Sequence, residues 1–262
     1  MVKAKPKALI IRAAGTNCNN ETALAFELAG AAAEQAHINE LIKGTKKLGD
    51  YNMLAIPGGF SYGDDLGSGK VLANQLAIKL RQPLQGFIES GKLVIGICNG
   101  FQVIIKMGLL PALSGLYVQE ATLTNNDSGK FEDRWIWMKT ENDSIFTRGI
   151  RRIYLPVNHG EGKFVAGSEV IERLLQEKLI KLKYANADGS DAKQYPSNPN
   201  GSLLNIAAIT NKEGNVFGML PHPEKFVTKY THPRWTREKL PEEGDGLKIF
   251  RNMAEYAEKE LM

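Results

Sequence analysis

The sequence predicts an α/β fold in which a mostly parallel central sheet is covered by helices on both faces. Short apolar runs alternate with helical patterns through the first half of the chain. These runs are apolar throughout, as is typical of parallel strands that are buried on both faces. No repeat or linker composition divides the 262 residues. We therefore expect one three-layer domain over residues 1–262, a length that a single large domain can fill.

The first half of the chain predicts strands and helices in alternation, starting with a strand at Lys7–Ile11. Asn20 is a candidate cap for a helix that carries Leu24, Leu28 and Ala31 or Ala32 on one face. The elements expected next are a strand at Met53–Ile56, a helix from Lys70 to about Ile88, a strand at Leu93–Ile97 and a helix at Gly100–Met107.

The second half of the chain is richer in strands. Those expected from apolar runs are Trp135–Met138, Ile153–Leu155, Ile206–Ile209 and Val216–Leu220. Two polar stretches, Asn186–Ser202 and Lys225–Gly246, are rich in turn-forming residues and predict long loops. The chain then ends in a predicted helix at Gly246–Leu261.

The composition argues against several classes of function. The net charge of +4, from 33 basic and 29 acidic residues, is too small and too scattered to indicate nucleic-acid binding. The apolar run at residues 8–11 is too short for a signal peptide or a membrane span. Two cysteines without zinc-site spacing predict neither a disulfide framework nor a metal site. We expect a cytoplasmic protein that binds no membrane, nucleic acid or metal.

A candidate nucleophile follows the most apolar strand. Cys98 is the centre of Gly96-Ile97-Cys98-Asn99-Gly100, a G-x-nucleophile-x-G elbow between a strand and a helix. The glycines are needed because a Cβ at either flank of such a sharp turn would meet the neighbouring chain. The positive end of the helix dipole beside Cys98 favours the thiolate. Cys18 lacks the paired glycines, so we expect it to be structural.

A candidate base lies in the segment Leu220-Pro221-His222-Pro223-Glu224, just beyond a predicted strand. Flanking prolines hold His222 in extended geometry. Glu224 lies two residues on and can turn back to the imidazole, fixing its tautomer as in other catalytic triads. Among the other histidines, His37 indicates a packing or surface position, and His232 precedes Pro233 in a polar segment without a carboxylate two residues on. His159, in the glycine-rich Asn158–Gly162, is a candidate for contact with a substrate or a partner protein.

Acyl transfer also requires N–H donors aimed at the developing oxyanion. The backbone N–H of Asn99, directly after the nucleophile, is one candidate. Gly58 and Gly59, in a Pro-Gly-Gly turn at another strand end, allow close approach of the backbone to a ligand and supply the second.

Together, these motifs resemble the class I, or triad, glutamine amidotransferases, in which cysteine, histidine and glutamate follow in this order. The closest resemblance is to the glutaminase subunits of phosphoribosylformylglycinamidine synthase. It rests on Pro57–Asp65 (Pro-Gly-Gly-Phe-Ser-Tyr-Gly-Asp-Asp), Cys98–Gln102 (Cys-Asn-Gly-Phe-Gln), Asn158–Gly162, Asn198–Ser202 and Gly214–Met219. The motifs span about residues 56–224, and the order of strands and helices extends the likeness to the N-terminus.

The resemblance implies a flavodoxin-like amidotransferase fold and a role for each motif residue. It makes Cys98 the nucleophile, His222 the base and acid, and Glu224 its orienting carboxylate. The two oxyanion donors would be Gly59 and Asn99, and the substrate-binding residues Gly58 and Gln102. By the same resemblance, glutamine is the substrate and this chain needs no cofactor. A larger synthetase subunit would carry ATP and Mg²⁺, and a small accessory subunit would complete the enzyme of purine biosynthesis.

Three other functions remain open from the sequence alone. A stand-alone cysteine hydrolase or peptidase could use the same elbow without any partner. A non-catalytic scaffold is a second alternative, although no triad residue is missing. An amidotransferase subunit that feeds a different synthetase is the third, and the motifs Phe60–Gly63 and Asn99–Gln102 argue against it.

Overall fold

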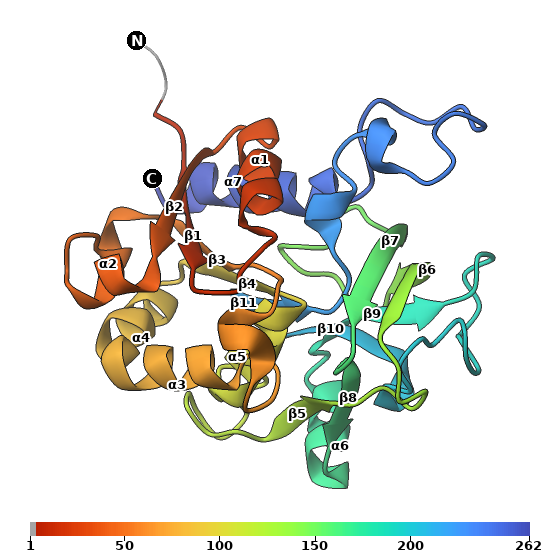
Figure 1. Ribbon diagram of the computed structural model, residues 1–262, viewed down its shortest axis with the longest axis horizontal. Helices are drawn as coiled ribbons and strands as arrows, with labels where there is room; N and C mark the ends of the chain where they lie inside the picture. The colour runs from red at the N-terminus through yellow and green to blue at the C-terminus, as the bar shows by residue number, and fades with distance from the viewer. Residues whose placement is uncertain (1–3) are drawn as a thin grey trace.

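The computed structural model describes residues 4–262 and is built around a nine-stranded sheet (Figure 1). The predicted domain over residues 1–262 therefore includes three residues, 1–3, that lie outside the described part. The strands, in chain order, are β1 Lys7–Arg12, β2 Ala32–His37, β3 Met53–Ile56, β4 Leu93–Ile97, β5 Ala121–Thr124, β6 Glu132–Thr140, β7 Arg152–His159, β8 Lys163–Ala166, β9 Ile180–Ala185, β10 Ile206–Thr210 and β11 Val216–Met219.

The large sheet has a parallel half and an antiparallel half, in the order β2-β1-β3-β4-β11-β10-β9-β6-β7. Strands β2, β1, β3, β4 and β11 pair in parallel, whereas every pairing from β11 onward to β7 is antiparallel. Strands β5 and β8 form a separate antiparallel ribbon. The α/β class predicted from the alternating first half is confirmed, and the strand-rich second half accounts for the antiparallel extension.

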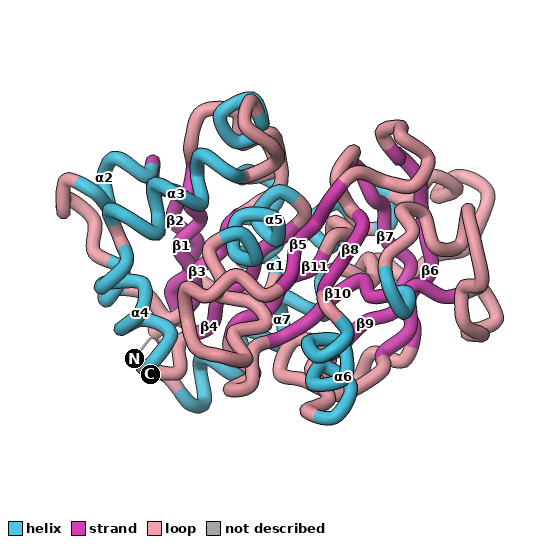
Figure 2. Tube along the Cα trace, turned by 90° about the horizontal axis from the view of Figure 1, so that it is seen from below, coloured by secondary structure: helices cyan, strands magenta, loops and turns pink. Residues whose placement is uncertain are grey.

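Helices cover both faces of the parallel half. Their bounds are α1 Asn19–Leu28, α2 Ile38–Ile42, α3 Lys70–Lys79, α4 Arg81–Glu89, α5 Asn99–Lys106, α6 Ser168–Gln176 and α7 Leu247–Glu260. Short 3-10 turns lie at Leu48–Asp50, Ser61–Asp64, Leu203–Asn205, Pro223–Lys225 and Lys229–Thr231. Figure 2 shows most helices gathered around β1 to β4, while loops surround much of the half that contains β6, β7 and β9.

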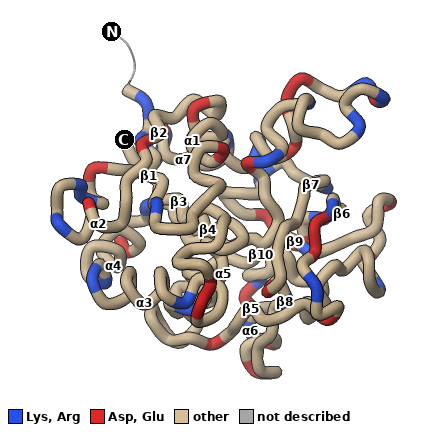
Figure 3. The backbone as a smooth tube through the Cα atoms, viewed as in Figure 1, with Lys and Arg blue, Asp and Glu red and all other residues tan. Residues whose placement is uncertain are grey.

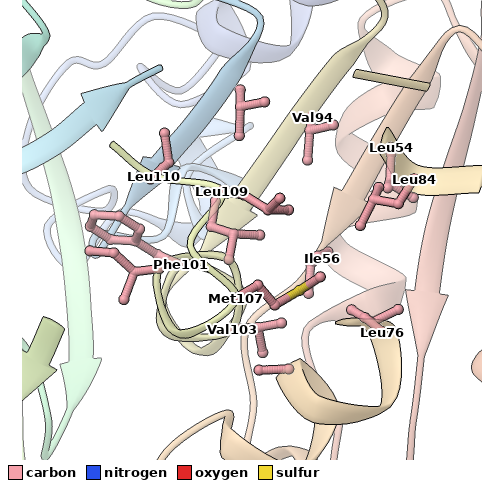
Figure 4. Packing of buried hydrophobic residues seen from close by; sticks show 14 of the residues in the cluster. Leu54, Ile56, Leu76, Leu84, Val94, Phe101, Val103, Met107, Leu109 and Leu110 are labelled. Carbon is pink, nitrogen blue, oxygen red and sulfur yellow. The ribbon is translucent and has the colours of Figure 1, made fainter. Parts of the chain in front are cut away.

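Side chains on the central strands alternate between two hydrophobic cores. On β1, Ala8 and Ile10 join the core beneath α1 and α7, where Phe26 meets Phe250 edge-on at 5.0 Å. The intervening Leu9 belongs to the opposite core, which α3, α4 and α5 cover. Figure 4 shows this second core, with strand residues Leu54, Ile56 and Val94 and helix residues Leu76, Leu84, Phe101 and Val103.

Two helices differ from the sequence prediction. Leu24 and Leu28 remain 48% and 43% exposed, because α1 packs on the sheet through its alanines and Phe26 instead. Ala32 lies in β2 rather than on this helix. The helix expected from residue 70 to 88 is two helices that break at Leu80, and Pro83 falls in the first turn of the second, where proline is tolerated.

Six helices and strands are not among those expected from the apolar patterns, namely β2, α2, β5, β8, α6 and β9. Strand β9 is hidden in the sequence because Lys181 and Lys183 interrupt its apolar run. Lys181 is buried to 9% exposure and donates to two backbone carbonyls, so the strand accommodates a charge that usually marks a surface. The loops predicted at residues 186–202 and 225–246 contain only turns, bends, isolated bridges and short 3-10 segments.

Charged residues are spread over the molecule without a region dominated by one sign, as the sequence indicates (Figure 3). Among residues 4–262, no helix is both long enough and apolar enough to cross a membrane.

Helix α5 lies very close to the sheet because glycines face it from both directions. A Cβ on Gly96 of β4 would lie 2.6 Å from the carbonyl oxygen of Gly100. A Cβ on Gly100 would overlap the carbonyl oxygen of Ile56, and one on Gly218 of β11 would overlap the ring of Phe101. These contacts fix the start of α5 against β3, β4 and β11.

A buried polar cluster joins the end of β7 to two loops. The ring of His159 is 2% exposed and contacts Asn126 Oδ1 at 3.1 Å through Nδ1 and Asn200 Nδ2 at 3.5 Å through Nε2. Asn200 also donates to the hydroxyl of Tyr184 at 3.0 Å. Burial, and then the charge of His222, lower the pKa of His159 to about 3. The ring is therefore neutral, with Nδ1 as donor and Nε2 as acceptor.

The first prediction tests the glycine contacts of α5. Gly218→Ala should lower the free energy of unfolding by about 1–3 kcal/mol, because the added methyl group overpacks the core at Phe101. Gly86→Ala is the matched control, since nothing lies within 4 Å of a Cβ at this position inside α4. It should raise the free energy of unfolding by up to about 1 kcal/mol. Equilibrium urea unfolding measures both, and a shift of the same sign in both variants would contradict the packing argument.

The second prediction concerns acid stability. Because the folded pKa of His159 lies below the usual 6.5, the unfolded chain binds a proton that the folded chain does not as pH falls from 6.5 toward 3. Stability should therefore fall with pH in this window by an extra ~1.4 kcal/mol per pH unit. His159→Gln should remove this increment from the slope, whatever its effect at neutral pH. Urea unfolding between pH 7.5 and 4.5 tests it, and parallel slopes would refute it.

Candidate active site

The elbow has the strand–turn–helix context that the sequence predicts. Cys98 lies between β4 and α5 with φ 50° and ψ −106°, a conformation that residues other than glycine rarely adopt. Its backbone N–H donates to the carbonyl of Met219 at 2.8 Å, which continues the pairing of β4 with β11. Such strain persists only where the surroundings determine it, and here the glycine contacts of α5 do so.

The thiol of Cys98 is nearly buried, at 4% exposure for the residue, and faces the end of β7. Sγ lies 3.4 Å from the carbonyl oxygen of Asn158. The side chain of Asn158 accepts from Lys225 Nζ at 2.8 Å and donates to the carboxylate of Asp133. Opposite the elbow, these hydrogen bonds therefore connect β7, β6 and the turn that follows His222.

His222 and Glu224 form a buried pair beyond the end of β11. The N–H of His222 donates to the carbonyl of Pro156 at 2.9 Å, and its backbone is extended at φ −100° and ψ 92°, as expected before Pro223. Nδ1 of the imidazole lies 2.5 Å from Glu224 Oε1. The side chains are 2% and 0% exposed, so the pair is shielded from water.

The other ring nitrogen of His222, Nε2, is buried without a hydrogen-bond partner among the described residues. Burial alone would lower the pKa of His222, but the charge of Glu224, followed by that of Cys98, raises it well above its usual value. The imidazolium is thus stabilised next to the candidate nucleophile. A proton on Nε2 is available for a leaving group beside Cys98.

The Pro-Gly-Gly turn after β3 presents a backbone N–H that does not donate a hydrogen bond to the adjacent segment at Gly15–Asn17. Thr16 and Gly59 form an isolated antiparallel bridge. The hydrogen bonds of this bridge run from the N–H of Asn17 to Gly58 O at 3.4 Å and from the N–H of Phe60 to Gly15 O at 2.9 Å. The N–H of Gly59 is left outside this pairing. At φ 140°, the residue also adopts a conformation that favours glycine.

Asn99 supplies the second candidate donor and ties the turn to the helix. As the first residue of α5, it carries one of the N–H groups that have no partner within the helix. Its side-chain Oδ1 accepts from the N–H of Ser61 at 3.2 Å, and its Nδ2 donates to Asp64 at 3.0 Å and to Gln102 at 2.9 Å. The segment after the Pro-Gly-Gly turn is thereby held on α5.

Gln102 extends this network to the loop after β7. Its Nε2 donates to the carbonyl of Glu161 at 2.6 Å, while its Oε1 accepts from Asn99. The carboxylate of Glu161 accepts from the N–H of Ser68 at 3.1 Å and lies 3.5 Å from Lys106 Nζ. Both ends of the Gln102 amide are therefore engaged, and the residue holds the loop after β7 against the start of α5.

The positions of the remaining histidines and of Cys18 can be compared with the roles that the sequence predicts for them. His37 caps α2, which fits the packing or surface position predicted for it. His232 packs on Trp135 with ring centroids 5.2 Å apart. His159 lies in its own buried cluster, and contact with a substrate or partner stays a prediction. Cys18 Sγ lies 4.0 Å from His222 Nδ1. The sequence offers one clue to this: Cys18 follows the first parallel strand, and loops at this edge of α/β sheets form sites.

Within residues 4–262, one group of side chains has donor atoms close enough to suggest a metal site, namely Cys18, His222 and Glu224, whose donor atoms lie within 4.8 Å of one another. Two tetrahedral zinc ligands at about 2 Å from the ion lie roughly 3.3 Å apart, so the 2.5 Å contact between imidazole and carboxylate fits a hydrogen bond rather than a shared zinc ion. The geometry is that of a hydrogen-bonded catalytic pair.

Comparisons with known proteins agree with this chemistry. The CobB/CobQ-like glutamine amidotransferase domain matches residues 5–257. The chain is 49% identical to "Phosphoribosylformylglycinamidine synthase subunit PurQ" of Dehalococcoides mccartyi, over 97% of this chain and 98% of that protein. It is 41% identical to the PurQ protein of Methanococcus maripaludis, over 99% of this chain and 100% of that protein.

A solved structure is similar over nearly the same length. The structure of PurLQS from Thermotoga maritima contains a chain that matches with a TM-score of 0.74 and 32% identity, over 96% of this chain and 99% of that one. A domain match and relatives that each span nearly the whole sequence lead to one conclusion. The chain belongs to the family of glutamine amidotransferases that includes the PurQ subunits of phosphoribosylformylglycinamidine synthase.

Proposed function

We propose that this chain is the glutaminase subunit of phosphoribosylformylglycinamidine synthase, which hydrolyses glutamine and passes ammonia to a separate synthetase subunit. The observation that carries the proposal is the strained Cys98 beside a buried His222–Glu224 pair, in a chain 49% identical to a PurQ subunit. In the synthetase, the ammonia converts formylglycinamide ribonucleotide to formylglycinamidine ribonucleotide in purine biosynthesis. We also propose that residues 1–262 act as one amidotransferase domain, since the family match covers residues 5–257.

The reaction begins at Cys98. The proton of the thiol resides on His222 as the imidazolium, and the sulfur attacks the carbonyl carbon of the glutamine side-chain amide. The tetrahedral oxyanion lies between the N–H groups of Gly59 and Asn99, neither of which is used by the pairing around it. Glu224 stabilises the imidazolium and keeps Nδ1 engaged, so that Nε2 delivers the proton.

The second half of the reaction releases both products. His222 protonates the leaving nitrogen, and ammonia departs as the γ-glutamyl thioester forms on Cys98. Water, deprotonated by His222, then attacks the thioester carbonyl, the C–S bond breaks, and glutamate leaves. Because ammonia in bulk water is mostly ammonium, transfer to the synthetase requires a passage that excludes water. We therefore expect low glutaminase activity from this chain alone.

Substrate binding is assigned to Gly58 and Gln102 by the likeness to the amidotransferase family. Gly58 lies directly against the base, because a Cβ there would lie 2.6 Å from the imidazole of His222. Gln102 holds the loop of Glu161 against the start of α5, and a direct contact with glutamine stays a prediction. His159 supports the same loop from its buried cluster.

The partners follow from the same family. The chain works with a larger synthetase subunit and a small accessory subunit, as the solved PurLQS structure of Thermotoga maritima illustrates by its name. ATP and Mg²⁺ are assigned to the synthetase subunit, and this chain uses no cofactor of its own. A cytoplasmic location remains a prediction. The PurQ relatives favour this synthetase over any other, and they disfavour a stand-alone hydrolase or a scaffold.

The third prediction identifies the nucleophile and the substrate. A diazo-ketone analogue of glutamine should form one covalent adduct, on Cys98, when the chain is assembled with its synthetase and accessory subunits. Intact mass and peptide mapping locate the adduct, and glutamine should slow its formation. Cys98→Ala is the control and should remain unmodified. An unmodified wild-type chain in the full complex would refute the amidotransferase mechanism.

The fourth prediction concerns Glu224. Glu224→Gln preserves the size of the side chain but removes the charge that raises the pKa of His222. The rate kcat for glutamine should fall by about 10²–10⁴-fold, by analogy with the loss of charge in other triads. Since ammonia leaves only after protonation by the imidazolium, the alkaline limb of the kcat profile should move to lower pH.

The control for this charge change is Glu255→Gln, which alters an exposed carboxylate paired with Arg148 far from the triad. It should leave kcat and its pH profile unchanged. Equal activity of Glu224→Gln and wild type would show that Glu224 does not orient the base.

A further inference from the structure

We propose that Cys18, the second cysteine of the chain, is a positioning residue that holds the Gly58–Gly59 peptide and the imidazole of His222 in a fixed mutual arrangement. The inference rests on the proposed function, because it assigns Cys18 a part in the same reaction. It concerns a residue outside the Cys–His–Glu set, and it follows from contacts that Cys18 makes with both halves of the catalytic apparatus.

The backbone of Cys18 orients the oxyanion donor. The N–H groups of Cys18 and Asn17 both point at the carbonyl oxygen of Gly58, at 3.2 and 3.4 Å. In a trans peptide, the carbonyl and the following N–H point in opposite directions within one plane. Two donors on the carbonyl of Gly58 therefore fix the direction of the N–H of Gly59. This is the N–H that stabilises the tetrahedral oxyanion.

The side chain of Cys18 reaches the base at the same time. Its Sγ lies 4.0 Å from His222 Nδ1 and 3.1 Å from Asn17 Oδ1, and the residue is 4% exposed. It also packs on Gly58, since a Cβ on that glycine would lie 3.3 Å from Sγ and 2.6 Å from the imidazole. The sulfur, the glycine and the imidazole thus form one continuous contact. A change in the volume of the thiol alters the position of the ring.

Helix α1 provides a rigid base for these contacts. Cys18 is the residue that precedes α1, and its carbonyl accepts from the N–H of Thr22 at 3.1 Å and from the Thr22 hydroxyl at 2.7 Å. The helix is in turn fixed to α7 through Phe26 and Phe250. Cys18 therefore holds the Gly58–Gly59 peptide and the imidazole of His222 at fixed positions relative to α1. These two groups must stay aligned within a fraction of an ångström.

Cys18 is suited to positioning rather than to attack. Burial raises the pKa of its thiol, against the opposing effect of a hydrogen bond with His222, so the neutral form is favoured. It also faces Nδ1, the nitrogen already engaged by Glu224, whereas proton transfer to the leaving group uses Nε2. A neutral thiol on this side of the ring supplies volume and a weak polar contact without competing for glutamine.

The test compares Cys18→Ala and Cys18→Ser in the complete complex with the synthetase and accessory subunits. Cys18→Ala should lower kcat for glutamine by about 10–100-fold with little change in KM, because misplacement of catalytic groups acts on the transition state. Cys18→Ser keeps a donor toward Asn17 and most of the volume, and it should retain kcat within about 3-fold of wild type. The diazo-ketone analogue gives a second readout, in which the maximal rate of Cys98 modification falls and the half-saturating concentration does not.

Leu84→Ala is the matched control. It removes a buried side chain from α4, in the core on the opposite face of the sheet from α1, so it should lower the melting temperature while kcat stays near wild type. A Cys18→Ala variant with wild-type kcat and modification rate would overturn the proposal. An equal loss of activity in Cys18→Ala and Leu84→Ala would also overturn it, because general destabilisation would then account for the effect.

A separate measurement distinguishes failure of this inference from failure of the proposed function. Alkylation of Cys98 by iodoacetamide requires no glutamine and depends on the thiolate that His222 stabilises. It should be slower in Cys18→Ala than in wild type between pH 6 and 9, and peptide mapping separates Cys98 from Cys18. If the wild-type complex lacked glutaminase activity, the proposed function would fail, whereas unchanged alkylation in Cys18→Ala would reject the positioning role by itself.

Discussion

The close approach of α5 to the sheet is the constraint on which the active site depends. Gly96, Gly100 and Gly218 allow the helix to start immediately after β4, and any Cβ among them would overlap a neighbouring atom or press within 2.6 Å of one. This close packing forces Cys98, at the junction of β4 and α5, into a backbone conformation with a positive φ. The same helix start leaves the N–H of Asn99 without a partner inside the helix, next to Cys98. One packing requirement therefore sets both the nucleophile and an oxyanion donor.

The order of the parallel strands explains how the other catalytic residues come to lie near Cys98. Strands β1, β3, β4 and β11 are consecutive neighbours in the sheet, and each is followed by a loop at the same edge. These four loops carry Cys18, the Gly58–Gly59 turn, Cys98 and His222 respectively. The carboxyl ends of parallel strands thus bring together residues that are far apart in the sequence. The antiparallel half adds the opposite wall through Asn158 at the end of β7.

This arrangement also shows what sequence reasoning could reach. The elbow and the His–x–Glu segment are local patterns, so Cys98, His222 and Glu224 could be selected without knowledge of the fold. The exposed face of α1 could not be predicted in the same way. Leu24 and the alanines on either side of it are compatible with more than one apolar helix face, and only packing against β1 and α7 decides which face is buried. Cys18 was equally hidden, since its contact with His222 joins residues 204 positions apart. Strand β9 was obscured by Lys181, which donates to two backbone carbonyls, and by Lys183, which pairs with Glu141, and no local pattern predicts these partners.

The site contains two buried histidines whose pKa values shift in opposite directions, and Glu224 is the main cause of the difference. His159 and His222 are both almost fully buried, and burial opposes the charged form of each. The ring of His159 contacts the side-chain amides of Asn126 and Asn200, and its pKa falls to about 3. His222 has Glu224 at 2.5 Å, and its pKa rises instead, with the charge of Cys98 as the next cause. The charge on His222 further lowers the pKa of His159. A proton shared by these groups therefore belongs to His222, the ring beside the nucleophile, and the polar cluster around His159 can fix the loops without competing for it.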